Sequence, residues 1–207
     1  MAVEFGIFVT PTAAEAEDVI GQVMAAEAAG LDLVGIQDHP YQRRFLDTFS
    51  LLAFLAGRTS RVRLFPDVAN LPLRHPAMIA KVSASIDVLS GGRFELGLGA
   101  GAFWDAIEAF GGRKLSGPES VDALEEAAER AGRDPRSIRR IANVNGMITD
   151  GPVEGWLRGP AEHWVEELGA LHAEHGFDGF VLWSDGDMTE QIGGLAAEVA
   201  PALKRAG

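Results

Sequence analysis

Residues 87–101 read DVLSGGRFELGLGAG, and this stretch decides the fold. It predicts the end of a helix, a turn at Gly91 and Gly92, a short buried strand over residues 93–98, and a glycine-rich exit. A strand that ends in glycines lets a ligand approach the backbone closely, because no Cβ stands in the way. Taken alone, the stretch indicates either a ligand site on an α/β scaffold or a simple tight turn.

Strands and helices alternate on both sides of this stretch. The patterns predict strands at residues 3–9, 31–36, 62–65, 94–98, 138–148 and 179–183, and helices at 13–29, 48–58, 76–89, 121–131, 160–175 and 188–205. Such alternation favours a parallel sheet with helical crossovers. We expect one domain over residues 1–207, because nothing in the chain resembles a linker.

Composition narrows the classes of partner. A formal net charge of −12 opposes binding to a phosphate backbone, so we expect no nucleic acid. There is no run of about 18 apolar residues, and the N-terminus leads directly into a strand. We therefore expect a cytoplasmic protein without a membrane partner.

Cysteine and histidine usage argues against a metal centre. The chain has no cysteine, which excludes disulfides, thiolate catalysis and thiolate ligands. His172 and His175 are three residues apart on an expected helix, but no carboxylate is placed to complete a site with them. We expect no metal.

Three motifs in combination resemble the luciferase-like monooxygenase family, which includes bacterial luciferase and the F420-dependent oxidoreductases. They are residues 87–101, LPLRHP at 71–76 and HGFDGFVLW at 175–183. The resemblance implies a TIM barrel and a cofactor that is either FMN or coenzyme F420. It also implies hydride transfer or O₂ activation on a small organic substrate.

The chain is short for such a barrel, which typically needs about 250 residues. In the family, a fifth and a sixth strand separate a motif like residues 121–127 from one like 131–135, and here the two motifs almost touch. The expected fold is therefore a truncated TIM-barrel-like α/β domain that lacks strands five and six. Exposed strand edges need a cover, so we expect a smaller barrel or a homodimer that covers the gap.

Site residues of a TIM barrel follow the carboxyl ends of its strands. The resemblance places the Asp38-His39 pair against the cofactor ring, with His39 as the catalytic residue. An imidazole suits proton transfer beside a ring that gains charge. The alternative is a turn that only caps the next segment. The resemblance also implies cofactor contacts at Val68 and Ala69, with a non-proline cis peptide bond near them.

After the fourth strand, the resemblance implies that the backbone of Gly99, Ala100 and Gly101 contacts the cofactor. Some sugar-phosphate-oxidising relatives carry a catalytic carboxylate just beyond this point, and this chain does not. We predict that three aromatic side chains line the substrate pocket: Phe103, Trp104 and Trp183. For Phe103 and Trp104 the alternative is packing in the core.

Other polar residues near the strand ends have two interpretations. Arg74 and His75 either touch the ligand or only begin a helix, and Asp185 and Asp187 are expected to cap the last helix. The segments that hold the cofactor phosphate in the family are the ones expected to be absent. An alternative function is therefore a non-catalytic binding or interaction protein. A third, an unrelated phosphate-substrate enzyme, is disfavoured because the chain lacks the usual glycine-rich nucleotide loops.

Overall fold

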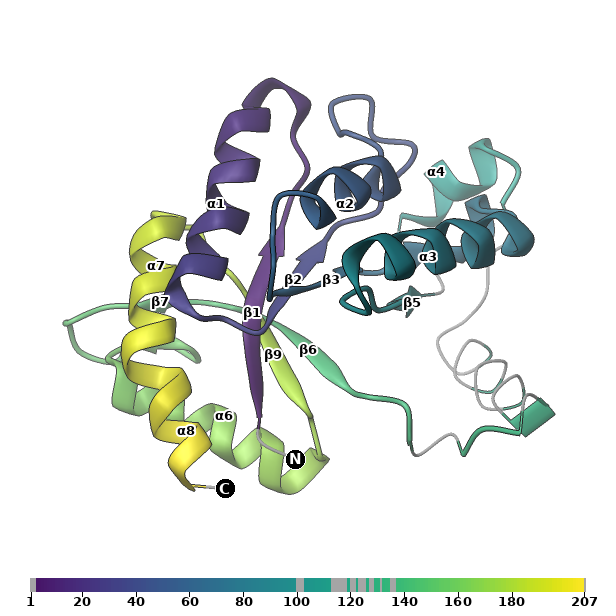
Figure 1. Ribbon diagram of the computed structural model, residues 1–207. Helices are drawn as coiled ribbons and strands as arrows, with labels where there is room; N and C mark the ends of the chain where they lie inside the picture. Colours follow the sequence, from purple (N-terminus) through teal and green to yellow (C-terminus); the bar gives the residue numbers. More distant parts are fainter. Residues whose placement is uncertain are drawn as a thin grey trace.

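The computed structural model describes residues 3–99, 103–112, 119, 122, 126, 129–130, 132–134 and 137–206. Its centre is a five-stranded parallel sheet with the order β3-β2-β1-β9-β6 (Figure 1). The strands are β1 (Glu4–Val9), β2 (Leu33–Ile36), β3 (Arg63–Pro66), β6 (Ile141–Asn145) and β9 (Gly179–Trp183).

Helices connect successive strands and cover the outer face of the sheet. The longer ones are α1 (Ala16–Ala29), α2 (Thr48–Ala56), α3 (Pro76–Ser90) and α6 (Ala161–His175). The C-terminal helix comprises α7 (Met188–Gly194), a π-helical turn (Leu195–Val199) and α8 (Ala200–Ala206). In Figure 1, α1 lies beside α7, and α2 lies beside α3. The predicted alternation of strands and helices is confirmed.

Side chains alternate between two faces along each strand, as a parallel barrel requires. Outward-facing residues such as Phe5, Ile7 and Val34 belong to the large core beneath the helices. Inward-facing residues form a smaller cluster, Phe8, Leu33, Phe65 and Val181, against which Ile141 packs. The sheet is thus curved around an interior of its own, which is the arrangement of a TIM-barrel wall.

The fourth predicted strand, residues 94–98, is only partly confirmed. Phe94 makes an isolated parallel bridge to Leu64 of β3, and a regular pair forms only further on, between β5 (Leu98–Gly99) and β4 (Ala69–Asn70). Glu95 N donates to Leu64 O at 2.9 Å, so the segment still follows the edge of β3. A segment that pairs with only one neighbour forms about half of the backbone hydrogen bonds of a central strand, which explains its irregular conformation.

Among the described residues between β5 and β6, none is in a strand, in agreement with a barrel shortened by two strands. The segment contains α4 (Trp104–Ala109), which the sequence did not predict. The predicted helix at 121–131 lies mostly outside the described residues. Two short elements, β7 (Met147–Ile148) and β8 (Arg158–Gly159), form a separate pair at the end of the predicted 138–148 strand.

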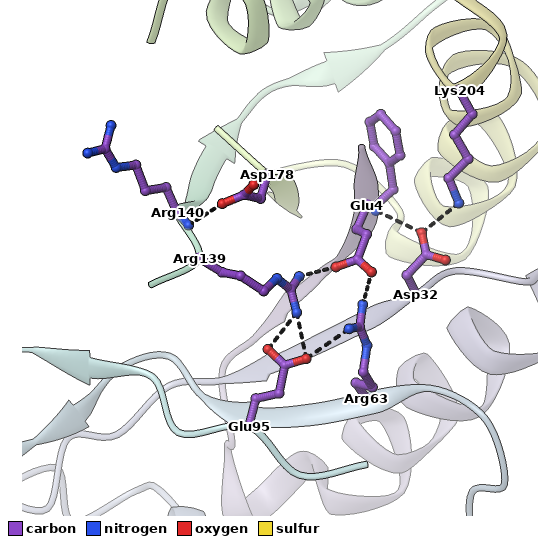
Figure 2. A network of polar contacts seen from close by, with 9 residues as sticks. Glu4, Asp32, Arg63, Glu95, Arg139, Arg140, Asp178 and Lys204 are labelled. Carbon is purple, nitrogen blue, oxygen red and sulfur yellow. Dashed lines mark hydrogen bonds and ion pairs between the residues drawn. The ribbon is translucent and has the colours of Figure 1, made fainter. Parts of the chain in front are cut away.

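Four charged side chains cross the amino-terminal end of the sheet and connect its two edges (Figure 2). Arg63 contacts Glu4 and lies 3.0 Å from Glu95, while Arg139 contacts Glu4 and lies 2.6 Å from Glu95. Glu95 belongs to the edge beside β3, and Arg139 lies two residues before the start of β6. This network links the edges at the point where further strands of a full barrel would connect them.

Candidate functional site

The carboxyl ends of the strands form a rim, and His39 lies on it directly after β2. Its ring stacks on Tyr41 with centroids 5.3 Å apart and on Phe45 at 6.3 Å, and it meets the edge of Phe103 at 5.3 Å. Burial lowers the pKa of His39, and the charge of Asp38 opposes this effect only in part. His39 is therefore a neutral imidazole at neutral pH, which can accept a proton.

Asp38 is buried and connects two segments of the rim. Its side chain is 1% exposed and accepts hydrogen bonds from the Asn70 backbone N at 2.9 Å and from Arg74 Nε at 2.7 Å. Arg74 also pairs with Asp47 at 3.0 Å and lies over the Phe49 ring, 4.7 Å from its centroid. Asp38 thus ties the loop after β2 to the segment after β3, and Arg74 is its partner.

The bulge after β3 contains a cis peptide bond between Asp67 and Val68, at the place where the sequence predicts one. Val68 is 39% exposed, whereas Ala69 is fully buried. The Ala69 backbone N donates to Gly97 O at 2.8 Å. Of these two residues, only Val68 has an exposed side chain.

The remaining predicted residues are distributed over the same rim. Gly99 lies in β5, while Ala100 and Gly101 are outside the described residues. Phe103 is 63% exposed, and Trp104 begins α4 and is half-buried. Trp183 is 50% exposed and packs against Phe8 at 5.8 Å.

The helix-capping interpretation holds for two of the polar residues. His75 Nδ1 accepts from Ala77 N at 3.3 Å at the start of α3, and Asp187 Oδ1 accepts from Thr189 N at 2.8 Å at the start of α7. Asp185 instead lies 3.6 Å from Arg158. His75 and Asp187 therefore serve local structure.

Sequence reasoning missed a polar pair inside the barrel, Asp67 and Asn143. Asn143 Nδ2 donates to Asp67 Oδ1 at 3.2 Å across the interior, and Asp67 is 8% exposed. Burial raises the pKa of Asp67 from 3.8 to about 6, which the hydrogen bond from Asn143 opposes. The signal was the spacing in residues 141–145, IANVN, which places asparagines on the inner face of an otherwise apolar strand.

Asp67 makes the stability of the fold depend on pH. Between about pH 4 and pH 6 the folded protein keeps a proton that the unfolded chain has released, so a rise in pH through this window destabilises the fold. We expect the unfolding free energy of the wild type, relative to Asp67→Asn, to fall by up to about 3 kcal/mol across it. Urea unfolding of both proteins at several pH values measures this difference, and a constant difference would contradict the assignment.

In the part of the chain that the structure describes, no three histidine, aspartate or glutamate side chains are grouped in a way that could hold a metal ion. No helix among the same residues is long and apolar enough to cross a membrane.

Comparison with known proteins adds independent information. A family model described as luciferase-like monooxygenase matches residues 3–119. An F420-dependent glucose-6-phosphate dehydrogenase of Kribbella flavida is 28% identical over 207 residues, which cover 92% of this chain and 60% of that protein. The chain spans 60% of that relative's length and 14% of the length of a second relative, a 4-hydroxyprotoasukamycin monooxygenase of Streptomyces nodosus subsp. asukaensis, to which it is 49% identical over 51 residues, or 25% of this chain.

Solved structures share the fold at low sequence identity. The F420-dependent tetrahydromethanopterin reductase of Methanopyrus kandleri superposes with a TM-score of 0.74 at 15% identity, over 98% of this chain and 100% of that one. The oxygenating constituent of 3,6-diketocamphane monooxygenase from Pseudomonas putida, in complex with FMN, has a TM-score of 0.69 at 18% identity, over 97% of this chain and 98% of the other. These likenesses support the barrel-type fold.

Proposed function

The chain belongs to the luciferase-like monooxygenase family, and from this premise we propose that it is an FMN- or F420-dependent oxidoreductase acting on a small organic molecule. The proposal rests on the composition of the rim at the carboxyl ends of the strands. A neutral His39, stacked on aromatic rings, lies on the same rim as the exposed Val68 side chain.

The described residues fit a planar redox ring. In the proposal, His39 and Val68 hold the ring, and the Gly99 backbone lies close to it because glycine adds no side chain. Asp38 and Arg74 act as positioning residues, because their hydrogen bonds fix the loop that carries His39. FMN or F420, when bound, supplies hydride transfer, or in the case of FMN also O₂ activation.

His39 has a proton-transfer role in this proposal. Its lowered pKa leaves the ring nitrogen free of a proton at neutral pH, so it can take a proton from a group that becomes acidic during the reaction. Gln37 Nε2 lies 3.4 Å from His39 Nδ1 and helps to orient the ring. Phe103, Trp104 and Trp183 form the apolar walls of the substrate pocket in the same proposal.

The cofactor phosphate needs a cationic partner, since the segments that supply it in the family are not found among the described residues. Arg43 and Arg44 are exposed on the loop that carries His39 and are our candidates. We also propose a cytoplasmic homodimer, in which the second subunit covers the open side of the barrel. Light scattering tests the dimer, and a monomer would contradict it.

Titration of the purified protein with FMN and with F420, followed by cofactor fluorescence, tests the proposed function. We expect a saturable change with one of the two. A second candidate function is that of a binding protein of the same fold without redox activity. It is suggested by the shortened barrel, in which the segments that bind the cofactor phosphate in the family are not found among the described residues. A linear response to both cofactors would support that candidate and contradict the first.

A further inference from the structure

A cavity of about 690 Å³ lies between the segment after α3 and the start of β6. Its lining is largely apolar and includes the carboxylate of Asp67. The apolar lining residues are Phe65, Val68, Leu96, Leu98 and Ile141, and charged side chains also take part. A cavity of this size accommodates a small organic molecule.

The carboxylate of Asp67 has fewer hydrogen bonds than its burial requires. Oδ1 accepts only the long bond from Asn143, at 3.2 Å, and Oδ2 is buried with no partner among the described residues. A carboxylate has about four acceptor positions, and each unsatisfied position in a buried group costs free energy. A purely structural role does not repay that cost, whereas a ligand that donates a hydrogen bond does.

Asn143 contacts Asp67, which lines the cavity, from the edge strand β6. It is exposed, although it lies in the middle of β6, because the neighbouring edge has no strand among the described residues. Its carboxamide can rotate away from Asp67 and donate to an incoming carbonyl oxygen while Asp67 accepts an N–H. The pair therefore presents one acceptor and one donor side by side.

The charges around the cavity favour a neutral ligand. Glu95 and Arg139 both line it, but they pair with each other at 2.6 Å. Arg133 Nε donates to Ser137 Oγ at 3.2 Å, and Arg140 Nη1 donates to the His175 carbonyl oxygen at 3.4 Å, so neutral acceptors hold both side chains. A ligand anion would meet the carboxylate of Asp67, which repels negative charge.

We propose that this cavity binds a neutral, largely apolar molecule through an amide-type edge, whose N–H donates to Asp67 and whose C=O accepts from Asn143. The proposal deepens the proposed function, since the molecule is either the substrate or the pyrimidine edge of the cofactor ring. Binding itself does not depend on redox activity, so it is measured without cofactor.

The test uses benzamide and N,N-dimethylbenzamide, which share the apolar ring and the carbonyl but differ in the N–H donor. Ligand-observed NMR gives the dissociation constant of each for the full chain. We expect benzamide to bind at least about tenfold more tightly, because a hydrogen bond to a carboxylate is lost in the dimethyl compound. We expect this preference to disappear in Asp67→Leu and to decrease in Asn143→Ala.

Asp105→Leu, on the exposed surface of α4, is the matched control and keeps the preference. Asn143→Ala removes an exposed side chain, so it provides a folded variant if Asp67→Leu is poorly folded. Failure of both probes to bind, equal binding of both, or a preference that survives in the two cavity variants overturns the proposal. Competition by FMN or F420 assigns the amide edge to the cofactor, and its absence assigns the edge to a substrate.

Discussion

Replacing Arg74 with leucine is expected to lower the free energy of unfolding by about 3–5 kcal/mol, because it leaves Asp38 buried without its charged partner. Arg74 donates to both Asp38 oxygens, at 2.7 and 2.5 Å, and the Asp38 side chain is 1% exposed. The substitution also removes the cation from the face of Phe49. Urea unfolding followed by circular dichroism measures the loss.

Arg58→Leu is the control for this experiment. Arg58 is exposed and lies over the Phe54 ring at 5.4 Å, without a buried carboxylate as partner. We expect it to change the unfolding free energy by less than about 1 kcal/mol. The double variant Asp38→Asn/Arg74→Leu should regain part of the stability, since the uncompensated charge is gone. A loss at Arg74 no larger than that at Arg58 would show that the ion pair contributes little.

Replacing His39 with phenylalanine is expected to slow the reaction of the bound cofactor by about 10²–10⁴-fold while cofactor affinity stays nearly unchanged. Phenylalanine keeps a planar ring against Tyr41 and Phe103 but cannot take a proton. Stopped-flow spectroscopy of the cofactor-loaded protein measures the rate, and fluorescence titration measures the affinity.

His175→Phe is the matched control, because His175 is exposed at the end of α6. It should leave both rate and affinity at the wild-type level. A lower rate with unchanged affinity indicates that His39 transfers a proton, whereas a loss of affinity would indicate that it mainly packs against the ring. A His39→Phe protein with the wild-type rate and an unchanged pH profile would remove His39 from the proposed mechanism.

Local signals in the sequence predicted the elements that depend on neighbouring residues. Gly91 was expected in a turn at the end of a helix, and it adopts the left-handed conformation that closes α3. Gly30 and Gly176 close α1 and α6 in the same way. The order of strands and helices along the chain followed from the alternation of strand-like and helix-like hydrophobic patterns and from the family resemblance. Helix α4 was missed because it spans only six residues, too few for a periodic pattern.

Long-range polar pairs were beyond the reach of sequence reasoning. Glu4 and Arg139 are 135 residues apart, and Asp67 and Asn143 are 76 apart. The inward alternation of β6 indicates which side chains face the interior, but not which residue of another strand lies opposite. That depends on the register and closure of the sheet, which a shortened barrel changes. The structural role of Asp38 likewise depends on a distant residue, because Arg74, its hydrogen-bond partner, lies 36 residues further along the chain.

The proposed function depends on a ring-binding rim at the carboxyl ends of β2 and β3 in an incomplete barrel. A crystal structure of the protein with FMN or F420 bound tests it most directly. We expect the ring to lie against Val68 with His39 in hydrogen-bonding or stacking contact. A cofactor bound elsewhere on the molecule, with His39 away from the ring, would contradict the proposed ring-binding rim.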